Sequence, residues 1–280
     1  MRVVGVHGIG NLGYLDRAGS PEAAATAMAA DWQGWLEAGV AAAGLDAGEL
    51  EVTAAYYSQH LRRGTAQAEG DLAAALSPEE QLLLVEWVEA LQLTPQIAQG
   101  PRTARARQAA DWLTRRVGPA ARFFVAAFCR EVQTYLASTQ SPRRAAARDT
   151  VSEVIVDTRP HVVVAHSLGS VVAYEALWDR PDLRVDLLVT IGSPLAMPGV
   201  VVPRLLPRVV RGRGRRPPGV GRWVNLADVG DIVAVPRSGL SGVFDEVEDL
   251  PPLTIGAWDF HTSQSYLRSP EVARVVVSSA

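Results

Sequence analysis

Hydrophobic residues in this sequence form short continuous runs of the kind found in strands that are buried on both faces. The clearest runs lie at residues 2–6, 162–164 and 185–191, and they are rich in β-branched valine. Less regular runs at 50–57 and 223–226 predict two further strands. Because the runs are continuous rather than alternating, and helical patterns separate them, they indicate an α/β fold with a predominantly parallel sheet flanked by helices.

Apolar residues at helical spacing predict helices between these strands. Ser20, Pro21 and Glu22 provide an N-cap, a first-turn proline and an acidic residue, and the pattern then continues to about residue 43. A further helix is predicted directly after Ser167. The remaining helical patterns lie at residues 72–76, 78–93, 103–117, 119–137 and 141–157.

A long stretch with helical patterns alone separates the strand near Tyr57 from the strand after His161. One helix, at 141–157, is enough to connect two strands of such a sheet. Residues 61–140 are therefore an expected helical insertion, a cap or lid within a single domain of residues 1–280. The apolar side of this insertion would either pack against the main domain or face a hydrophobic substrate.

Composition matters mainly through what it excludes. The formal charge of −3 argues against nucleic acid as the main partner. The single cysteine, Cys129, excludes an internal disulfide, and its apolar surroundings predict a buried structural thiol. Since no apolar segment approaches the ~20 residues of a membrane span and no secretion signal opens the chain, we expect a cytoplasmic protein without a transmembrane segment.

No metal or cofactor is expected from the sequence. The histidines are dispersed, and neither a His-Glu-x-x-His nor a paired-cysteine spacing occurs. A P-loop and a dinucleotide-binding glycine pattern are also missing from the sequence.

A basic stretch runs from Arg204 to Arg222 and includes the sequence RGRGRRPPGVGR. Its arginines, glycines and prolines show no apolar period, which predicts a mobile, solvated loop. Binding of an anionic membrane surface or of an acidic partner is the alternative interpretation of such a charge run.

The run at 162–164 leads directly into Ala165-His166-Ser167-Leu168-Gly169 and then into a helical pattern. A strand that turns straight into a helix holds its turn residue in a strained conformation, and small residues two positions away on either side avoid a collision. Such a turn lifts the Ser167 hydroxyl out of the sheet and directs the first helix amides towards it. The alternative is that Ser167 is an ordinary helix N-cap.

The Ala-His-Ser-x-Gly pattern resembles the nucleophile elbow of the α/β-hydrolase family, in the form found in some small bacterial lipases. Ala165 stands where the family usually has glycine. The resemblance covers residues 2–57 and 141–267, and it implies an α/β-hydrolase fold with Ser167 as the nucleophile and no cofactor.

The same resemblance implies an oxyanion hole made by two backbone amides. One would belong to Leu168, and the other to Ile9 in the glycine-rich turn that follows the first strand. Glycines in this turn would let the main chain approach a substrate oxygen, although a plain glycine turn is the alternative. We expect His7 to brace the turn, and His60 is either a pocket residue or a surface histidine. The candidate pocket residues are His7, Gly8, Gly10, His166 and His60.

α/β hydrolases use the chain order nucleophile, acid, base, and Ser167, Asp231 and His261 follow this order. A serine hydroxyl needs an imidazole to take its proton, and a carboxylate must orient that imidazole. The Gly-Asp-x-Val context of Asp231 is similar to the acid-to-base segment of lipase-like families. Asp228 is the alternative acid, whereas Asp259 lies too near His261 along the chain to orient it well.

These features predict a serine hydrolase that cleaves an acyl ester of a small-molecule or acyl-chain substrate. The same residues would serve an acyltransferase, a thioesterase, an amidase or a peptidase, because the triad does not choose the leaving group. A non-catalytic binding module built on a hydrolase fold is the alternative from another class of protein.

Overall fold

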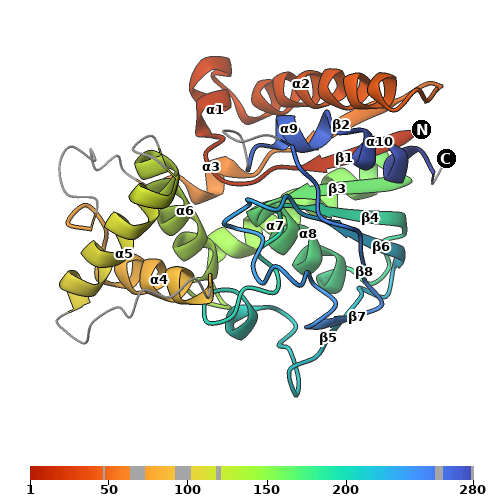
Figure 1. The fold of residues 1–280 in the computed structure, drawn as a ribbon. Helices are drawn as coiled ribbons and strands as arrows, with labels where there is room; N and C mark the ends of the chain where they lie inside the picture. Colours follow the sequence, from red (N-terminus) through yellow and green to blue (C-terminus); the bar gives the residue numbers. More distant parts are fainter. Residues whose placement is uncertain (47, 64–72, 92–101, 118–120, 256–260, 279–280) are drawn as a thin grey trace.

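The computed structural model describes residues 1–46, 48–63, 73–91, 102–117, 121–255 and 261–278. Within these residues, six strands form one sheet in the order β2-β1-β3-β4-β6-β8, and all neighbouring strands pair in parallel (Figure 1). The expected parallel α/β sheet is therefore present. Its strands are β1 (Arg2–Val6), β2 (Glu51–Ala55), β3 (Val162–His166), β4 (Val185–Ile191), β6 (Val220–Leu226) and β8 (Glu248–Asp249).

The direction of strand addition reverses between β1 and β3. The chain first places β2 on one side of β1, and later returns to place β3, β4, β6 and β8 in turn on the other side. In open α/β sheets the connections at such a point diverge, and they leave a crevice at the carboxyl ends of the two strands where ligands bind. His7 begins the turn after β1, and Ser167 directly follows β3. The reversal therefore brings two of the predicted site segments together.

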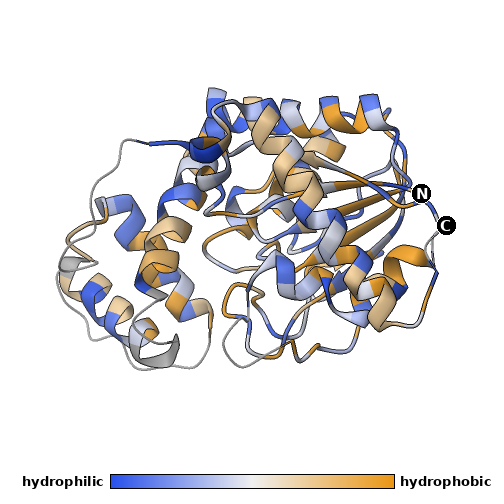
Figure 2. Cartoon of the chain, turned by 90° about the horizontal axis from the view of Figure 1, so that it is seen from above, coloured by the Kyte–Doolittle hydropathy of each residue, from blue (hydrophilic) through white to orange (hydrophobic). Residues whose placement is uncertain are grey.

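Helices cover both faces of the sheet, because successive strand residues point to opposite sides. Val3 and Val162 belong to an apolar core shared with α2, α9 and α10, whereas Val4 and Val163 belong to a core shared with α7 and α8. The strands are coloured largely hydrophobic in Figure 2, as expected for a sheet covered on both faces. The helices flanking the sheet are α1 (Leu12–Ala18), α2 (Pro21–Ala42), α7 (Pro142–Thr158), α8 (Leu168–Asp179), α9 (Ser263–Leu267) and α10 (Pro270–Val277).

Three helices from the predicted insertion pack on one another beside the sheet, at the left of Figure 1. They are α4 (Pro78–Ala90), α5 (Arg102–Val117) and α6 (Ala121–Leu136), and the short α3 (Ser58–Leu61) precedes them. A hydrogen bond of 2.8 Å from Trp87 Nε1 on α4 to the carbonyl of Ile232 joins them to the loop after β6. The insertion therefore lies against loops at the carboxyl ends of the strands.

The structure differs from the sequence prediction in two segments. Residues 73–75 form a turn rather than the helix predicted for 72–76, and residue 72 lies outside the described residues. The Arg204–Arg222 stretch is more ordered than the predicted mobile loop, since it contains β5 (Gly214–Arg215), which pairs with β7 (Phe244–Asp245), and the first residues of β6. Four ion pairs stabilise it: Arg204–Glu86, Arg213–Asp245, Arg216–Glu246 and Arg222–Glu248.

Cys129 lies in α6 and is fully buried, as the sequence predicts. Burial raises the pKa of its thiol far above the ordinary value, which keeps the thiol neutral. None of the helices in the described part of the chain combines the length and the apolar character needed to cross a lipid bilayer.

Candidate active site

Ser167 is the single residue between the end of β3 and the start of α8. Its backbone angles, φ 53° and ψ −131°, lie in a region that costs a residue with a side chain about 1–3 kcal/mol. Its side chain makes no capping hydrogen bond to the helix, so the interpretation as a plain N-cap is wrong. A Cβ atom at Gly169 would lie 2.3 Å from the carbonyl oxygen of His7, which explains why a glycine follows two residues later.

His261 connects Ser167 to Asp231. Its Nε2 lies 2.8 Å from Ser167 Oγ, and its Nδ1 lies 2.8 Å from Asp231 Oδ2. The carboxylate can only accept at Nδ1, so the ring proton belongs on Nδ1 and Nε2 keeps its lone pair towards the serine. Ser167, Asp231 and His261 are 0 %, 3 % and 7 % exposed, so this hydrogen-bonded chain is shielded from solvent.

Asp231 receives hydrogen bonds on both carboxylate oxygens. Oδ1 accepts from the backbone amides of Val233 at 2.8 Å and Ala234 at 3.2 Å. Oδ2 accepts from the hydroxyl of Tyr266 at 2.8 Å in addition to facing His261. Together these hydrogen bonds fix the orientation of the Asp231 carboxylate towards His261.

Two residues that the sequence did not single out shape this part of the site. One is Tyr266 on α9, which lies 35 residues from Asp231 in the chain. The other is Gly192, directly after β4, which has φ +56°. A Cβ atom there would lie 2.8 Å from Asp231 Oδ2 and 3.2 Å from His261 Cε1, so only glycine leaves room for the pair.

Asp228, the alternative acid, has a different set of contacts. Its Oδ1 accepts from the amide of Gly230 at 2.7 Å and its Oδ2 from the amide of Ile255 at 2.8 Å. Its own amide donates to the hydroxyl of Tyr266 at 2.8 Å. Asp228 therefore joins loops around the site, while Asp231 faces the imidazole. Asp259, which is too near His261 in the sequence to orient it well, lies outside the described residues.

The turn after β1 lies directly against the serine. A Cβ atom at Gly8 would lie 2.6 Å from Ser167 Cβ and 3.2 Å from Ser167 Oγ, so the main chain makes the close approach that the glycine allows. Asn11 Nδ2 donates to the carbonyls of Gly8 and Ile9, each at 3.0 Å, and this fixes the turn. The side chain of Ile9 packs on the apolar core.

His7 supports this turn from inside the protein. Its Nδ1 donates to the carbonyl of Gly8 at 2.7 Å, and its Nε2 accepts from the amide of Tyr57 at 3.1 Å. The imidazole also stacks on the Tyr57 ring, with 4.2 Å between ring centroids. Burial lowers the pKa of His7 to about 4, so near neutral pH the ring is uncharged and keeps both hydrogen bonds.

The two remaining candidate histidines differ in position. His166 is buried beside His261, with 4.8 Å between the centroids of the two rings, and burial lowers its pKa well below the ordinary value. His60 lies on α3 and is hydrogen-bonded to Thr150 of α7 at 3.1 Å. The contacts of His60 are therefore with α7 rather than with the serine, the acid or the base.

Helix α6 of the insertion reaches the site at two points. The ring of Phe124 meets that of His261 edge-on, with 5.3 Å between centroids. Glu131 Oε1 accepts from the amide of Gly10 at 2.9 Å, which links the helix to the turn after β1. Burial raises the pKa of the Glu131 carboxyl to about 7. Neither residue was predicted, because nothing in the local sequence indicates which side of α6 faces the sheet.

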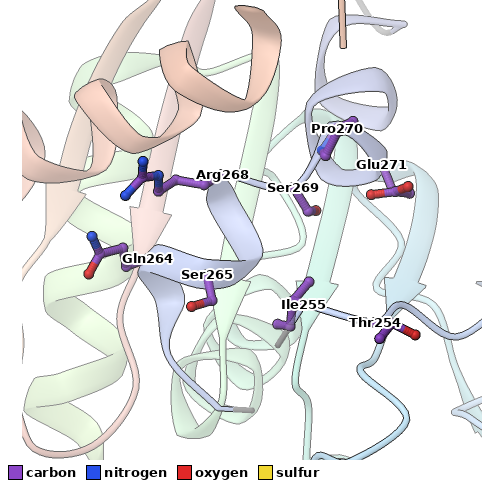
Figure 3. A pocket seen from close by; sticks show the side chains of 8 residues that line it. All are labelled: Thr254, Ile255, Gln264, Ser265, Arg268, Ser269, Pro270 and Glu271. Atoms are coloured by element: carbon purple, nitrogen blue, oxygen red, sulfur yellow. The ribbon is translucent and has the colours of Figure 1, made fainter. Parts of the chain in front are cut away.

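A separate open hollow of about 510 Å³ lies between the segment after β8 and helices α9 and α10. Figure 3 shows the eight residues that line it, and Ser167, Asp231 and His261 are not among them. Among the described residues, no group of three or more His, Cys, Asp and Glu side chains is placed to hold a metal ion.

Comparisons with protein-family models, with curated proteins and with solved structures find no match for this chain. The geometry of the site is therefore the basis for a proposed function. It combines a strained serine, an imidazole within hydrogen-bonding distance and a buried carboxylate behind that imidazole.

Proposed function

We propose that this protein is a serine hydrolase of the α/β-hydrolase type that cleaves an acyl ester. The observation that carries this proposal is the pair of 2.8 Å contacts that connect Asp231, His261 and Ser167. These residues come from three separate segments, at the carboxyl end of β3, in the loop after β6 and just before α9. Such an arrangement is recognised by its geometry and by the role of each group.

In the first step, Ser167 Oγ attacks the carbonyl carbon of the substrate and its proton passes to His261 Nε2. The imidazole becomes a cation, and Asp231 stabilises that cation through its contact with Nδ1. The bond to the leaving alcohol then breaks, His261 returns the proton to the alcohol oxygen, and an acyl-serine remains.

The negative charge that develops on the carbonyl oxygen needs donors that are already in place. Leu168 is the first residue of α8, and a first-turn amide has no acceptor within its own helix. The amide of Ile9 is the second donor in this proposal, because the turn that contains it lies against Ser167. Loss of one such donor costs about 2.7–4 kcal/mol of transition-state stabilisation in well-studied hydrolases.

In the second half of the reaction, water replaces the alcohol. His261 Nε2 takes a proton from the water, the resulting hydroxide attacks the acyl carbon, and Ser167 leaves with the proton that His261 returns. The protein is thereby restored and a carboxylic acid is released.

In this proposal the helices of the insertion act as a lid. Ser167 has no exposed surface, so a substrate reaches it only when covering groups move. Phe124 of α6 lies against the imidazole of His261, and its ring would contact an acyl chain bound beside Ser167. An apolar cover of this kind favours esters with hydrophobic acyl chains over acetyl esters.

The test is labelling with a fluorophosphonate probe, which reacts with activated serines. We expect labelling of the native protein, no labelling of Ser167→Ala, and full labelling of Ser152→Ala, a buried serine on α7 that serves as the matched control. If the folded native protein is not labelled, it is a binding module rather than a hydrolase. Ester, thioester and amide substrates of increasing acyl length would then identify the preferred leaving group and chain.

A further inference from the structure

The arginines of the 204–222 stretch fall into two groups. This stretch contains seven arginines and no carboxylate. Four of the seven form ion pairs with carboxylates elsewhere in the chain: Arg204, Arg213, Arg216 and Arg222. The other three, Arg208, Arg211 and Arg215, are exposed, and none of them forms an ion pair with a carboxylate of the described residues.

All three arginines without a carboxylate partner line the same cavity, which has a volume of about 620 Å³. Its apolar lining residues are Tyr174 and Trp178 of α8 together with Pro207 and Val210. Arg213 and Asp245 also line the cavity, but they neutralise one another as an ion pair. The lining therefore combines three positive charges that have no carboxylate partner with several apolar residues, in a protein whose net charge is −3.

This cavity is separate from the proposed catalytic centre. Trp178 lies ten residues beyond Leu168 on α8, which corresponds to about 15 Å along the helix axis. Ser167 lies at the opposite end of that helix. None of Ser167, Asp231 and His261 lines the cavity.

The wall that carries the arginines is fixed to the body of the protein. Arg144 of α7 and Glu175 of α8 form a buried ion pair, and Glu175 Oε1 also accepts from the amide of Leu206 at 3.0 Å. Arg144 Nη2 donates to the carbonyl of Arg204 at 2.7 Å. These bonds hold the start of the stretch, and mutual hydrogen bonds between Val210 and Arg213 hold its tip.

We propose that this cavity binds an amphipathic anion, an oxyanion group carried on an apolar body. The oxyanion would be bound by Arg208, Arg211 and Arg215, because guanidinium groups bind carboxylates, phosphates and sulfates with paired hydrogen bonds. The apolar body would pack on the partly exposed ring of Trp178 and on the exposed side chain of Val210, and remove their surface from water. A bound anion also relieves the repulsion among three like charges around one cavity.

The first test is isothermal titration of the native protein with decanoate below its micellar concentration. Decanol carries the same chain without the charge, and butyrate carries the charge without the long chain. We expect decanoate to bind more tightly than either control ligand. If decanol or butyrate binds as tightly as decanoate, the cavity does not recognise an amphipathic anion and the proposal is wrong.

The second test uses variants that keep the fold. Arg211→Gln and Arg215→Gln each remove a charge that makes no ion pair, and we expect each to weaken decanoate binding by about tenfold. Arg222→Gln is the matched control, because Arg222 is an exposed arginine outside the cavity. Circular dichroism would verify that all three variants are folded.

Two results would contradict the proposal. Equal decanoate affinity in native protein and in the Arg211→Gln and Arg215→Gln variants would place the ligand elsewhere, the catalytic centre included. Binding to vesicles of anionic phospholipid, without binding of monomeric decanoate, would show that the arginines contact a membrane surface instead of a ligand in the cavity. The test does not depend on hydrolysis, so it also applies if Ser167 proves inactive.

Discussion

The hydroxyl of Tyr266 lies 2.8 Å from Asp231 Oδ2, the same oxygen that lies 2.8 Å from His261 Nδ1. A phenol has one proton to donate, and the amide of Asp228 donates to the Tyr266 oxygen, so the proton points to Asp231. Burial, and then the charge of Asp231, raise the pKa of Tyr266 far above its ordinary value, so the phenol stays neutral. In the proposed mechanism, Tyr266 therefore positions Asp231.

Replacing Tyr266 by phenylalanine should slow the reaction without changing substrate affinity. The variant removes one hydrogen bond to a carboxylate, and we expect kcat on a model ester to fall about tenfold with KM nearly unchanged. Tyr14→Phe is the control, because Tyr14 on α1 also donates to a carboxylate, that of Asp31, and an equal loss in both variants would argue against the positioning role.

The two candidate acids can be separated by isosteric amide variants. Asp231→Asn should lower kcat by about 10⁴-fold, because an amide cannot stabilise the imidazolium and favours the wrong ring tautomer. Asp228→Asn should retain most of the rate and lose stability instead, since one of its two carboxylate oxygens would become an amide nitrogen facing a backbone N–H. Steady-state kinetics and urea unfolding of both variants provide the measurement. The reverse ranking of rates would make Asp228 the acid.

Glycine is required at position 169 by the contact between α8 and the turn after β1. Gly169→Ala would place a methyl group against the carbonyl oxygens of Val6 and His7, at 2.4 and 2.3 Å before relaxation. We expect a loss of about 3 kcal/mol or more in the free energy of unfolding. Gly34→Ala, at an exposed position of α2 with open space around it, should instead stabilise the protein by about 0.5–1 kcal/mol. Similar midpoints in urea for both variants would contradict this account.

The stability of the protein should depend on pH through Glu131. Burial raises the pKa of this carboxyl to about 7 in the folded protein, above its value of 4.5 in an unfolded chain. The folded state therefore holds a proton that the unfolded state has lost between these two values, and stability falls as pH rises through this range. The effect approaches about 3 kcal/mol, since each pKa unit corresponds to 1.36 kcal/mol.

His7 acts in the opposite direction, because its pKa is lowered to about 4 in the folded state. A comparison with Glu131→Gln isolates the carboxyl, since both proteins retain His7. Glutamine preserves an oxygen acceptor for the amide of Gly10, so we expect the variant to gain stability over native protein as pH rises from 5 to 8. Urea unfolding of both proteins at several pH values measures this difference. If the free energies of unfolding of the two proteins change with pH in parallel, the raised pKa of Glu131 is contradicted.

The main strands could be predicted because they are buried on both faces. Residues 2–6 and 185–191 form β1 and β4 with the bounds that their continuous apolar runs indicate. By contrast, β8 consists of Glu248 and Asp249, which carry no hydrophobic signal, and it forms only because β6 offers an edge for pairing. The strand predicted at 50–57 is shorter in the structure, Glu51–Ala55, because the chain turns into α3 at its end.

The candidate site shows the same division between local and long-range information. The turn at Ser167 is local, since two small neighbours and a strained serine lie within five residues. Tyr266, Gly192 and Glu131 reach the site from distant parts of the chain, and no spacing in the sequence relates them to Asp231 or to Gly10. The sequence predicts a solvated loop for the 204–222 stretch because the carboxylate partners of its arginines lie outside that stretch.

The complete burial of Ser167 bears on the fate of an acyl group attached to it. In the proposed reaction, an acyl-serine enclosed in this way would meet bulk water only while the covering groups are displaced, whereas an alcohol retained beside it would be available at once. The lifetime of the enclosed state would then decide between release of a free acid and transfer of the acyl group to a retained acceptor. The ratio of ester to free acid formed in the presence of added alcohols would show whether the enclosure favours acyl transfer or hydrolysis.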